Sequence, residues 1–297
     1  MKKLDVATRR GTVLNGALFL SSGRTDTLVI AITGIHGNFY SNPFYYDIGD
    51  ALNAAGVDFA YAQTRNAFGV IRTWNAITEN EEVIGSWNER FAETDEDIAA
   101  YLDEGERRGY EHIVLAGHSL GANKVIYYLS RHHDPRVEHF ILMSPANVDY
   151  MTGGVTRDER EIVASLVAQG RGDEMLPFPL MGWVDCTVAT AADWLGPTLN
   201  NVHTSHDGDW SQISRITHTG ALLIGTYDRF TDGAPAAFLE NINSHFPKAD
   251  ENQLVFIEKT GHTYQQKHRE VAGAITRLVL GWHDATNGCN EIFMQRQ

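Results

Sequence analysis

The chain has 297 residues, of which 43% are hydrophobic, so it is long enough to bury a sizeable core. It carries 24 Lys and Arg against 38 Asp and Glu, a formal charge of −14. This acidic balance argues against binding to nucleic acid or to anionic membrane surfaces, because their phosphates would be repelled.

Further features bear on the compartment and on bound groups. No apolar run approaches the roughly 20 residues that cross a bilayer, and the first residues, MKKLD, lack the apolar region of a signal peptide. Cys186 and Cys289 show no spacing typical of a zinc site or of a disulfide framework. We therefore expect a cytoplasmic protein with two unpaired thiols and no metal site.

Strand and helix patterns alternate along most of the chain. Residues 4–8 and 12–20 read as a hairpin, and the apolar run TLVIAIT at 27–33 is typical of a strand covered on both faces. Helices and strands are then expected, in chain order, at 45–55, 57–62, 89–108, 112–116, 121–131, 137–143, 220–225, 235–243, 253–258 and 268–282. The alternation predicts an α/β fold with a mostly parallel central sheet flanked by helices, and with the hairpin adding antiparallel strands at one edge.

Two long stretches interrupt this alternation. Residues 65–87 form a long connection between a strand and a helix. Residues 147–215 separate two core strands and contain a helical pattern at 157–169. Because a structureless loop of that length is uncommon in a compact domain, we interpret 147–215 as an inserted, mostly helical cap over the carboxyl edge of the sheet. The core domain is then 1–146 together with 216–297.

The sequence GHSLG marks the candidate nucleophile, Ser119. It follows the strand HIVLA and precedes a helix, which is the context in which a tight turn lifts a serine hydroxyl above a sheet. The two glycines suit such a turn because larger side chains would collide there. The alternative is a structural turn whose serine only caps the helix.

A serine hydroxyl needs a neighbouring base, and the base needs an orienting acid. His262 follows the last strand in a Gly-His loop, which singles it out among 13 histidines. Asp228 is the first carboxylate after the preceding strand, in the chain order serine, acid, histidine. Asp232 and Asp149 remain alternatives for the acid.

The negative charge that develops on the carbonyl oxygen during acyl transfer requires fixed N–H donors. One is expected to be the backbone N–H of Leu120, directly after the candidate nucleophile. The other is expected from the loop GIHGN, which follows the 27–33 strand. There we choose the N–H of Asn38, with Gly37 as the alternative.

Together the HG loop, the GHSLG turn, the late Asp and the terminal GH resemble the α/β-hydrolase superfamily over nearly the whole chain. The resemblance implies a catalytic triad of Ser119, His262 and Asp228, with Asn38 and Leu120 as oxyanion donors. The segments GSW at 85–87, ERF at 89–91 and KVIYY at 124–128 also look like the branch that contains fungal siderophore esterases and uncharacterised bacterial relatives.

These observations predict a serine hydrolase that cleaves a carboxylic ester with a small to medium acyl or aryl group through an acyl-enzyme, without a cofactor. The expected partner is a small-molecule ester, and self-association is left open. Two other functions are alternatives: an acyltransferase or thioesterase acting on a carrier-bound acyl group, and a non-catalytic binding protein. Aromatic residues of the cap either line an apolar pocket or form a small core of their own.

Overall fold

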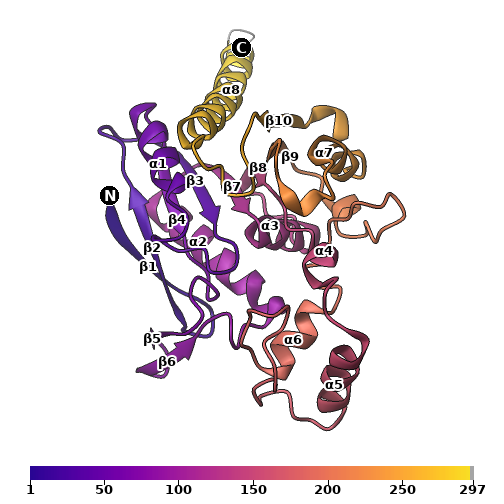
Figure 1. Cartoon of the computed structure of the whole chain (residues 1–297). Helices are drawn as coiled ribbons and strands as arrows, with labels where there is room; N and C mark the ends of the chain where they lie inside the picture. The colour runs from indigo at the N-terminus through magenta and orange to yellow at the C-terminus, as the bar shows by residue number, and fades with distance from the viewer. Residues whose placement is uncertain (295–297) are drawn as a thin grey trace.

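A single eight-stranded sheet forms the centre of the molecule (Figure 1). The structure, a computed structural model, describes the backbone of residues 1–294 and the side chains of residues 1–283. The strand order is β1-β2-β4-β3-β7-β8-β9-β10. The strands are β1 (Lys2–Ala7), β2 (Val13–Phe19), β3 (Thr27–Ile32), β4 (Asp58–Ala62), β7 (His112–His118), β8 (Val137–Met143), β9 (Thr219–Gly225) and β10 (Gln253–Ile257).

The sheet is mostly parallel, as the alternating pattern predicts. β4, β3, β7, β8, β9 and β10 run parallel to one another, whereas β1 pairs antiparallel with β2, and β2 pairs antiparallel with β4. The parallel strands therefore bring their carboxyl ends to one edge, where side chains from distant parts of the sequence meet.

Helices cover both faces of the sheet. α1 (Phe44–Ala54) packs beside α8 (His268–Met294) on one face, and α2 (Thr94–Arg108), α3 (Leu120–Arg131) and α7 (Pro235–Ser244) pack on the other. The sequence of β3 is a continuous apolar run because both faces of this strand are buried. Ile30 and Ile32 belong to the core on the α3 side, whereas Val29 and Ala31 belong to the core beside α1. Period-two alternation thus supplies both cores from one strand.

The connection at 65–87 contains structure that the sequence reading missed. It forms the hairpin β5 (Ile71–Asn75) and β6 (Asn80–Ile84), which pair antiparallel as a separate two-stranded sheet. The side chain of Asn75 accepts hydrogen bonds from the N–H groups of Ile77 and Thr78 and so stabilises the turn between the strands. Helix α2 also begins at Thr94, five residues later than expected from Glu89.

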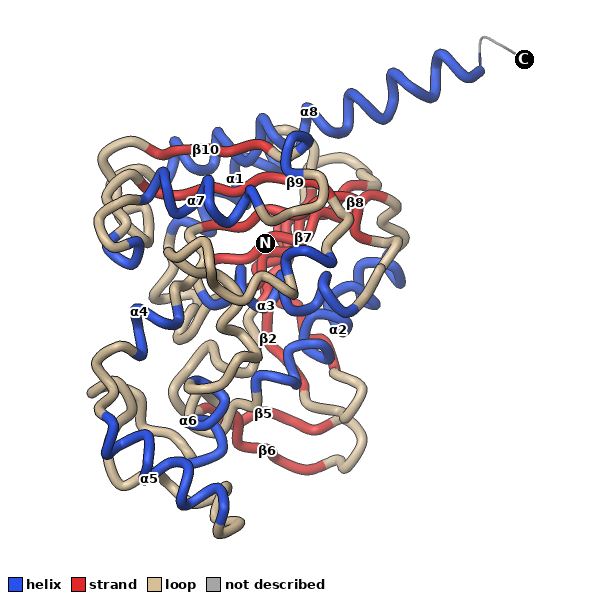
Figure 2. Tube along the Cα trace, turned by 90° about the vertical axis from the view of Figure 1, so that its right-hand side faces the viewer, coloured by secondary structure: helices blue, strands red, loops and turns tan. Residues whose placement is uncertain are grey.

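The segment 147–215, hereafter the insertion, contains α4 (Val148–Thr152), α5 (Arg157–Ala168), α6 (Val188–Trp194) and extended connections. In both views α5 and α6 lie on the same side of the main sheet as the β5–β6 hairpin (Figures 1 and 2). The insertion has its own apolar cluster, which includes the fully buried Trp194 and also Leu120 at the start of α3. The aromatic residue Trp194 is therefore part of a small core rather than of a pocket wall.

Asn123 on α3 binds the chain on both sides of α4–α6. Its Nδ2 donates to the carbonyl oxygens of Ala146 and Leu199, each at 2.9 Å, and its Oδ1 accepts from the N–H of Ala146 at 2.8 Å. The side chain is fully buried, so these bonds are shielded from competing water. One amide thus joins the helix that follows Ser119 to the chain before and after α4–α6.

A buried ion pair joins α3 to the segment before α2. Lys124 Nζ lies 2.5 Å from Glu89 Oε1 and donates to Thr64 Oγ1 at 3.0 Å, while Asn66 Nδ2 donates to Glu89 Oε2 at 2.8 Å. The side chains of Lys124 and Glu89 are 0% and 1% exposed. Removing one partner would leave the other charge buried without compensation.

We therefore expect Lys124→Met to lower the free energy of unfolding by about 3–5 kcal/mol. Urea denaturation of the wild type and the variant measures this change. Lys267→Met is the matched control, because Lys267 pairs with Glu270 at the surface and its loss should cost at most about 1 kcal/mol. Equal losses for the two variants would contradict the prediction.

Candidate active site

Ser119 lies at the junction of β7 and α3, at the carboxyl edge of the sheet. Its φ of +55° places it in a region that residues other than glycine rarely adopt. The flanking glycines are required by space: a Cβ on Gly117 would lie 2.3 Å from the carbonyl oxygen of Gly121, and a Cβ on Gly121 would lie 2.4 Å from that of Ile32. The sharp turn presents the serine to a cavity of about 220 Å³.

Two loops bring a histidine and an aspartate to Ser119. His262 follows β10, and its Nε2 lies 2.9 Å from Ser119 Oγ. Asp228 follows β9, and its Oδ2 lies 2.8 Å from His262 Nδ1. An ionised carboxylate can only accept, so Nδ1 carries the ring proton, and Nε2 is left to accept the serine hydroxyl's proton. The predicted serine, histidine and aspartate therefore form one chain of hydrogen bonds.

The surroundings of Asp228 keep it ionised. Burial alone would raise the pKa of Asp228, whose side chain is only 1% exposed. The hydrogen bond and electrostatic attraction to the imidazole of His262, together with the N–H of Phe230, outweigh this effect, so the net pKa is lowered. The ring of Phe230 packs edge-on against the imidazole of His262 at 4.6 Å between centroids. These contacts fix both the charge of the acid and the orientation of the base.

The two alternative acids lie elsewhere. Asp149 on α4 accepts from Asn200 Nδ2 at 2.6 Å and lies 2.8 Å from Nδ1 of a different histidine, His203. Asp232 is exposed, in a left-handed conformation after the short 3₁₀ helix that follows Asp228. Of the three aspartates considered, the one hydrogen-bonded to His262 is Asp228.

The oxyanion loop differs from its prediction. The N–H of Asn38 donates to Ser41 Oγ at 2.9 Å, and the N–H of Gly37 donates to the carbonyl oxygen of Gly34 at 3.0 Å. Asn38 was expected to offer this N–H to the substrate, and Gly37 was the alternative, but both groups are already engaged within the loop. These contacts do not support Asn38 or Gly37 as the oxyanion donor, because the loop residues that line the Ser119 cavity are the earlier Gly34 and Ile35.

The part of the loop nearest the serine is Gly34 and Ile35, which line the same cavity. A Cβ on Gly34 would lie 2.9 Å from Ser119 Cβ and 3.3 Å from the backbone nitrogen of Leu120. Within the part of the chain that the structure describes, the N–H groups of Ile35 and Leu120 have no protein hydrogen-bond partner, and Leu120 is the first residue of α3. The sequence predicted Leu120 as an oxyanion donor but not Ile35. Ile35 nevertheless lies in the loop GIHGN, from which the second donor was expected.

His118, directly before the serine, also contacts the loop of the base. Its Nε2 lies 2.7 Å from the carbonyl oxygen of His262, so Nε2 carries the proton and donates it. Burial, followed by the electrostatic interaction with the neighbouring imidazole of His262, lowers the pKa of His118 to about 3. The neutral imidazole therefore connects the turn that carries the nucleophile to the loop that carries the base.

This environment predicts an acid-sensitive contribution to stability. In the unfolded chain the imidazole of His118 has its ordinary pKa of 6.5, so that state binds a proton below pH 6.5, whereas the folded state binds it only near pH 3. Stability is complete above pH 6.5 and falls by about 1.4 kcal/mol per pH unit as the pH drops toward 3. Urea denaturation between pH 4 and 8 should show a steeper loss in the wild type than in His118→Phe; parallel curves would contradict it.

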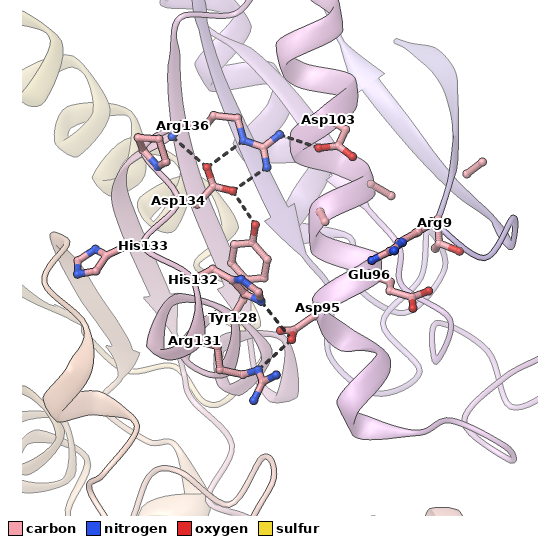
Figure 3. A pocket seen from close by; sticks show the side chains of 15 residues that line it. Arg9, Asp95, Glu96, Asp103, Tyr128, Arg131, His132, His133, Asp134 and Arg136 are labelled. Atoms are coloured by element: carbon pink, nitrogen blue, oxygen red, sulfur yellow. Dashed lines mark hydrogen bonds and ion pairs between the residues drawn. The ribbon is translucent and has the colours of Figure 1, made fainter.

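A larger cavity, about 820 Å³, lies away from Ser119, between α2, the end of α3 and the β1–β2 turn (Figure 3). Charged side chains line it and pair with one another: Arg131 with Asp95 at 2.9 Å, and Arg136 with Asp134 at 2.7 Å. These contacts neutralise the charges that a ligand would have to bind. We assign no catalytic role to this cavity.

Within the described residues, no cluster of His, Cys, Asp or Glu has the arrangement of a metal site. The same residues include no helix long and apolar enough to cross a membrane. Cys186 is buried and free, and burial raises the pKa of its thiol to about 12. The side chain of Cys289 lies outside the described residues.

The strand order, with Ser119 at the carboxyl edge between β7 and α3, defines a protein with the α/β-hydrolase fold. The chain belongs to the alpha/beta hydrolase family, whose model matches residues 35–274. No curated protein matches the sequence.

Solved structures share the fold over nearly the full length. Est1E from Butyrivibrio proteoclasticus is 16% identical, with 95% of this chain and 98% of that chain covered and a TM-score of 0.62. DcsB, solved with a substrate analogue, is 14% identical, with 94% and 99% covered and a TM-score of 0.67. An esterase from Exiguobacterium antarcticum is 17% identical, with 95% and 99% covered and a TM-score of 0.58. At these identities the likeness is one of fold.

Proposed function

We propose that this hydrolase cleaves carboxylic esters, with Ser119 as nucleophile, His262 as base and Asp228 as the acid that orients the base. The observation that carries the proposal is the chain of hydrogen bonds from Asp228 through His262 to Ser119, at 2.8 and 2.9 Å. These distances are within the range needed for proton transfer from the hydroxyl to the imidazole.

The reaction follows from these contacts in two steps. Ser119 Oγ forms a bond to the ester carbonyl carbon while its proton passes to His262 Nε2. The same proton then goes to the leaving alkoxide as the carbon–oxygen bond breaks, which releases the alcohol and leaves an acyl group on Ser119. Water then attacks the acyl carbon while giving up a proton to His262 Nε2, and the bond from this carbon to Ser119 Oγ breaks as the proton passes from His262 to Oγ, which releases the free acid.

The tetrahedral intermediates carry negative charge on the former carbonyl oxygen. We assign the N–H groups of Ile35 and Leu120 as its donors, because Ile35 lines the Ser119 cavity, Leu120 directly follows Ser119, and neither N–H has a protein partner among the described residues. Each such donor contributes a few kcal/mol to lowering the barrier. The amino end of α3 adds a favourable field at the same point. We further propose that the insertion acts as a cap, since its residues Met151 and Trp183 line this cavity.

Hydrolysis of short esters such as 4-nitrophenyl acetate, combined with labelling by a fluorophosphonate probe, tests the proposal. We expect release of free acid and covalent labelling, with mass spectrometry placing the label on Ser119. Addition of an acceptor alcohol should not be required for turnover. A protein that neither turns over these esters nor reacts with the probe would refute the proposal and favour a binding role.

A further inference from the structure

A second cavity adjoins the one at Ser119. It measures about 420 Å³ and is lined by residues of three separate segments, among them His36, Val70, Trp87, Met175 and Trp183. Trp183 lines both cavities, so the two share a wall. A volume of this size is typical of small-molecule sites, whereas the Ser119 cavity alone, at about 220 Å³, holds little more than the reacting group.

The walls of the second cavity are mostly apolar, with three aromatic residues among the lining and Ser86 and Asp185 as its hydroxyl and carboxylate members. Val70, Met175 and Trp183 are 65%, 51% and 47% exposed, which is unusual for three large apolar side chains that meet at one place. The imidazole of His36 packs edge-on against the Trp183 indole at 5.6 Å, and its Nε2 lies 2.7 Å from Oγ of the buried Ser86.

His36 contributes to this wall as a neutral ring. Burial lowers the pKa of its imidazole, so the ring is uncharged near neutral pH. Its neighbours in the wall include the indoles of Trp87 and Trp183. Flat aromatic groups pack edge-on or offset against such partners and are stabilised beyond the area that they bury, which an alkyl chain is not.

The position of the cavity indicates which half of an ester it receives. The leaving oxygen must lie within reach of His262 Nε2 to be protonated. None of the described residues lining the second cavity comes from the loops that carry Asp228 and His262, and one of them, His36, directly follows the oxyanion loop residue Ile35. This placement favours the acyl group, rather than the alcohol, as the half of the ester that enters the second cavity.

We propose that the second cavity binds the acyl portion of the substrate and selects an aromatic acyl group, as in esters of arylalkenoic or arylalkanoic acids. This inference rests on the proposed ester hydrolysis. It adds a substrate class to that reaction and assigns Trp183, Trp87 and His36 to its recognition.

The test compares kcat/KM for methyl cinnamate, methyl octanoate and methyl acetate, which share one alcohol and differ only in the acyl group. The wild type should prefer cinnamate to octanoate by about tenfold, and octanoate to acetate by less. Trp183→Ala should lower the cinnamate-to-acetate ratio about tenfold, and Val70→Trp, which fills the cavity, should lower it as well.

Trp74→Ala is the matched control, because Trp74 is 49% exposed on β5 and does not line the cavity. It should leave the ratio unchanged. Hydrolysis of acetate without preference for cinnamate, or ratios unaffected by both cavity variants, would overturn the inference while leaving ester hydrolysis intact. Failure to cleave any of the three esters would instead count against the proposed function.

Discussion

Ser119→Ala is expected to lower kcat for 4-nitrophenyl acetate by about 10⁵-fold. Without Oγ no acyl-enzyme forms, and the imidazole of His262 has no hydroxyl proton to accept. The residual rate should exceed that of the uncatalysed reaction, because the proposed oxyanion donors, the N–H groups of Ile35 and Leu120, remain in place when water attacks directly. Loss of an entire nucleophile is among the largest effects that one substitution has on an enzyme.

Initial rates and fluorophosphonate labelling of the wild type and the variant measure this effect. Ser130→Ala is a suitable control, because Ser130 lies near the far end of α3, the helix that follows Ser119, and its hydroxyl donates to the carbonyl oxygen of Tyr127. The control should keep full activity and full labelling. A Ser119→Ala protein that retained more than about a hundredth of the wild-type rate would show that another group attacks the ester.

Asp228→Asn is expected to lower kcat by about 10⁴-fold while the fold remains intact. An asparagine amide presented to His262 Nδ1 favours the tautomer in which Nε2 carries the proton, and that tautomer cannot accept a proton from Ser119. The loss of negative charge also removes the stabilisation of the imidazolium that forms during attack.

Asp232→Asn provides the matched comparison, four residues further along the chain and exposed. It should keep activity within about twofold of the wild type, since exposed charges away from the site have small effects. Thermal unfolding of both variants separates loss of catalysis from loss of structure. If Asp232→Asn were the more damaging change, the assignment of the acid would have to be reversed.

The parts of the fold that could be read from the sequence are those dictated by local pattern. Apolar runs such as 27–33 predict buried strands, because parallel strands are covered on both faces, and β3 is such a strand. The turn that carries Ser119 could also be predicted from local pattern. At Gly117 and Gly121 a Cβ would collide with neighbouring backbone, so only glycine fits at these two positions. His262 and Asp228 were found from their places after strands.

The features that were not predicted depend on contacts that form only in the folded chain. The Asn38 N–H is engaged by Ser41 Oγ, and no pattern in GIHGN reveals which of its amides faces the serine. The β5–β6 hairpin left a weak signal in the alternation of IRTWN, where Ile71 and Thr73 are less exposed than Arg72 and Trp74. The predicted start of α2 at Glu89 treats this residue as part of an exposed helical face. In the structure its side chain is instead buried in an ion pair with Lys124. Such a pairing 35 residues apart leaves no trace in helical periodicity.

The three hydrogen bonds of Asn123 have a mechanical consequence for the insertion. Because the side chain of Asn123 binds both Ala146 and Leu199, the chain between these two residues forms a closed loop whose ends meet at Asn123. The α6 part of this loop is held a second time, because Asp193 accepts from the N–H of Phe91 and Thr190 Oγ1 donates to the carbonyl oxygen of Glu89. Displacing α6 would therefore break these bonds as well as strain those of Asn123, so the loop is fixed at two points, one of them four residues past Ser119.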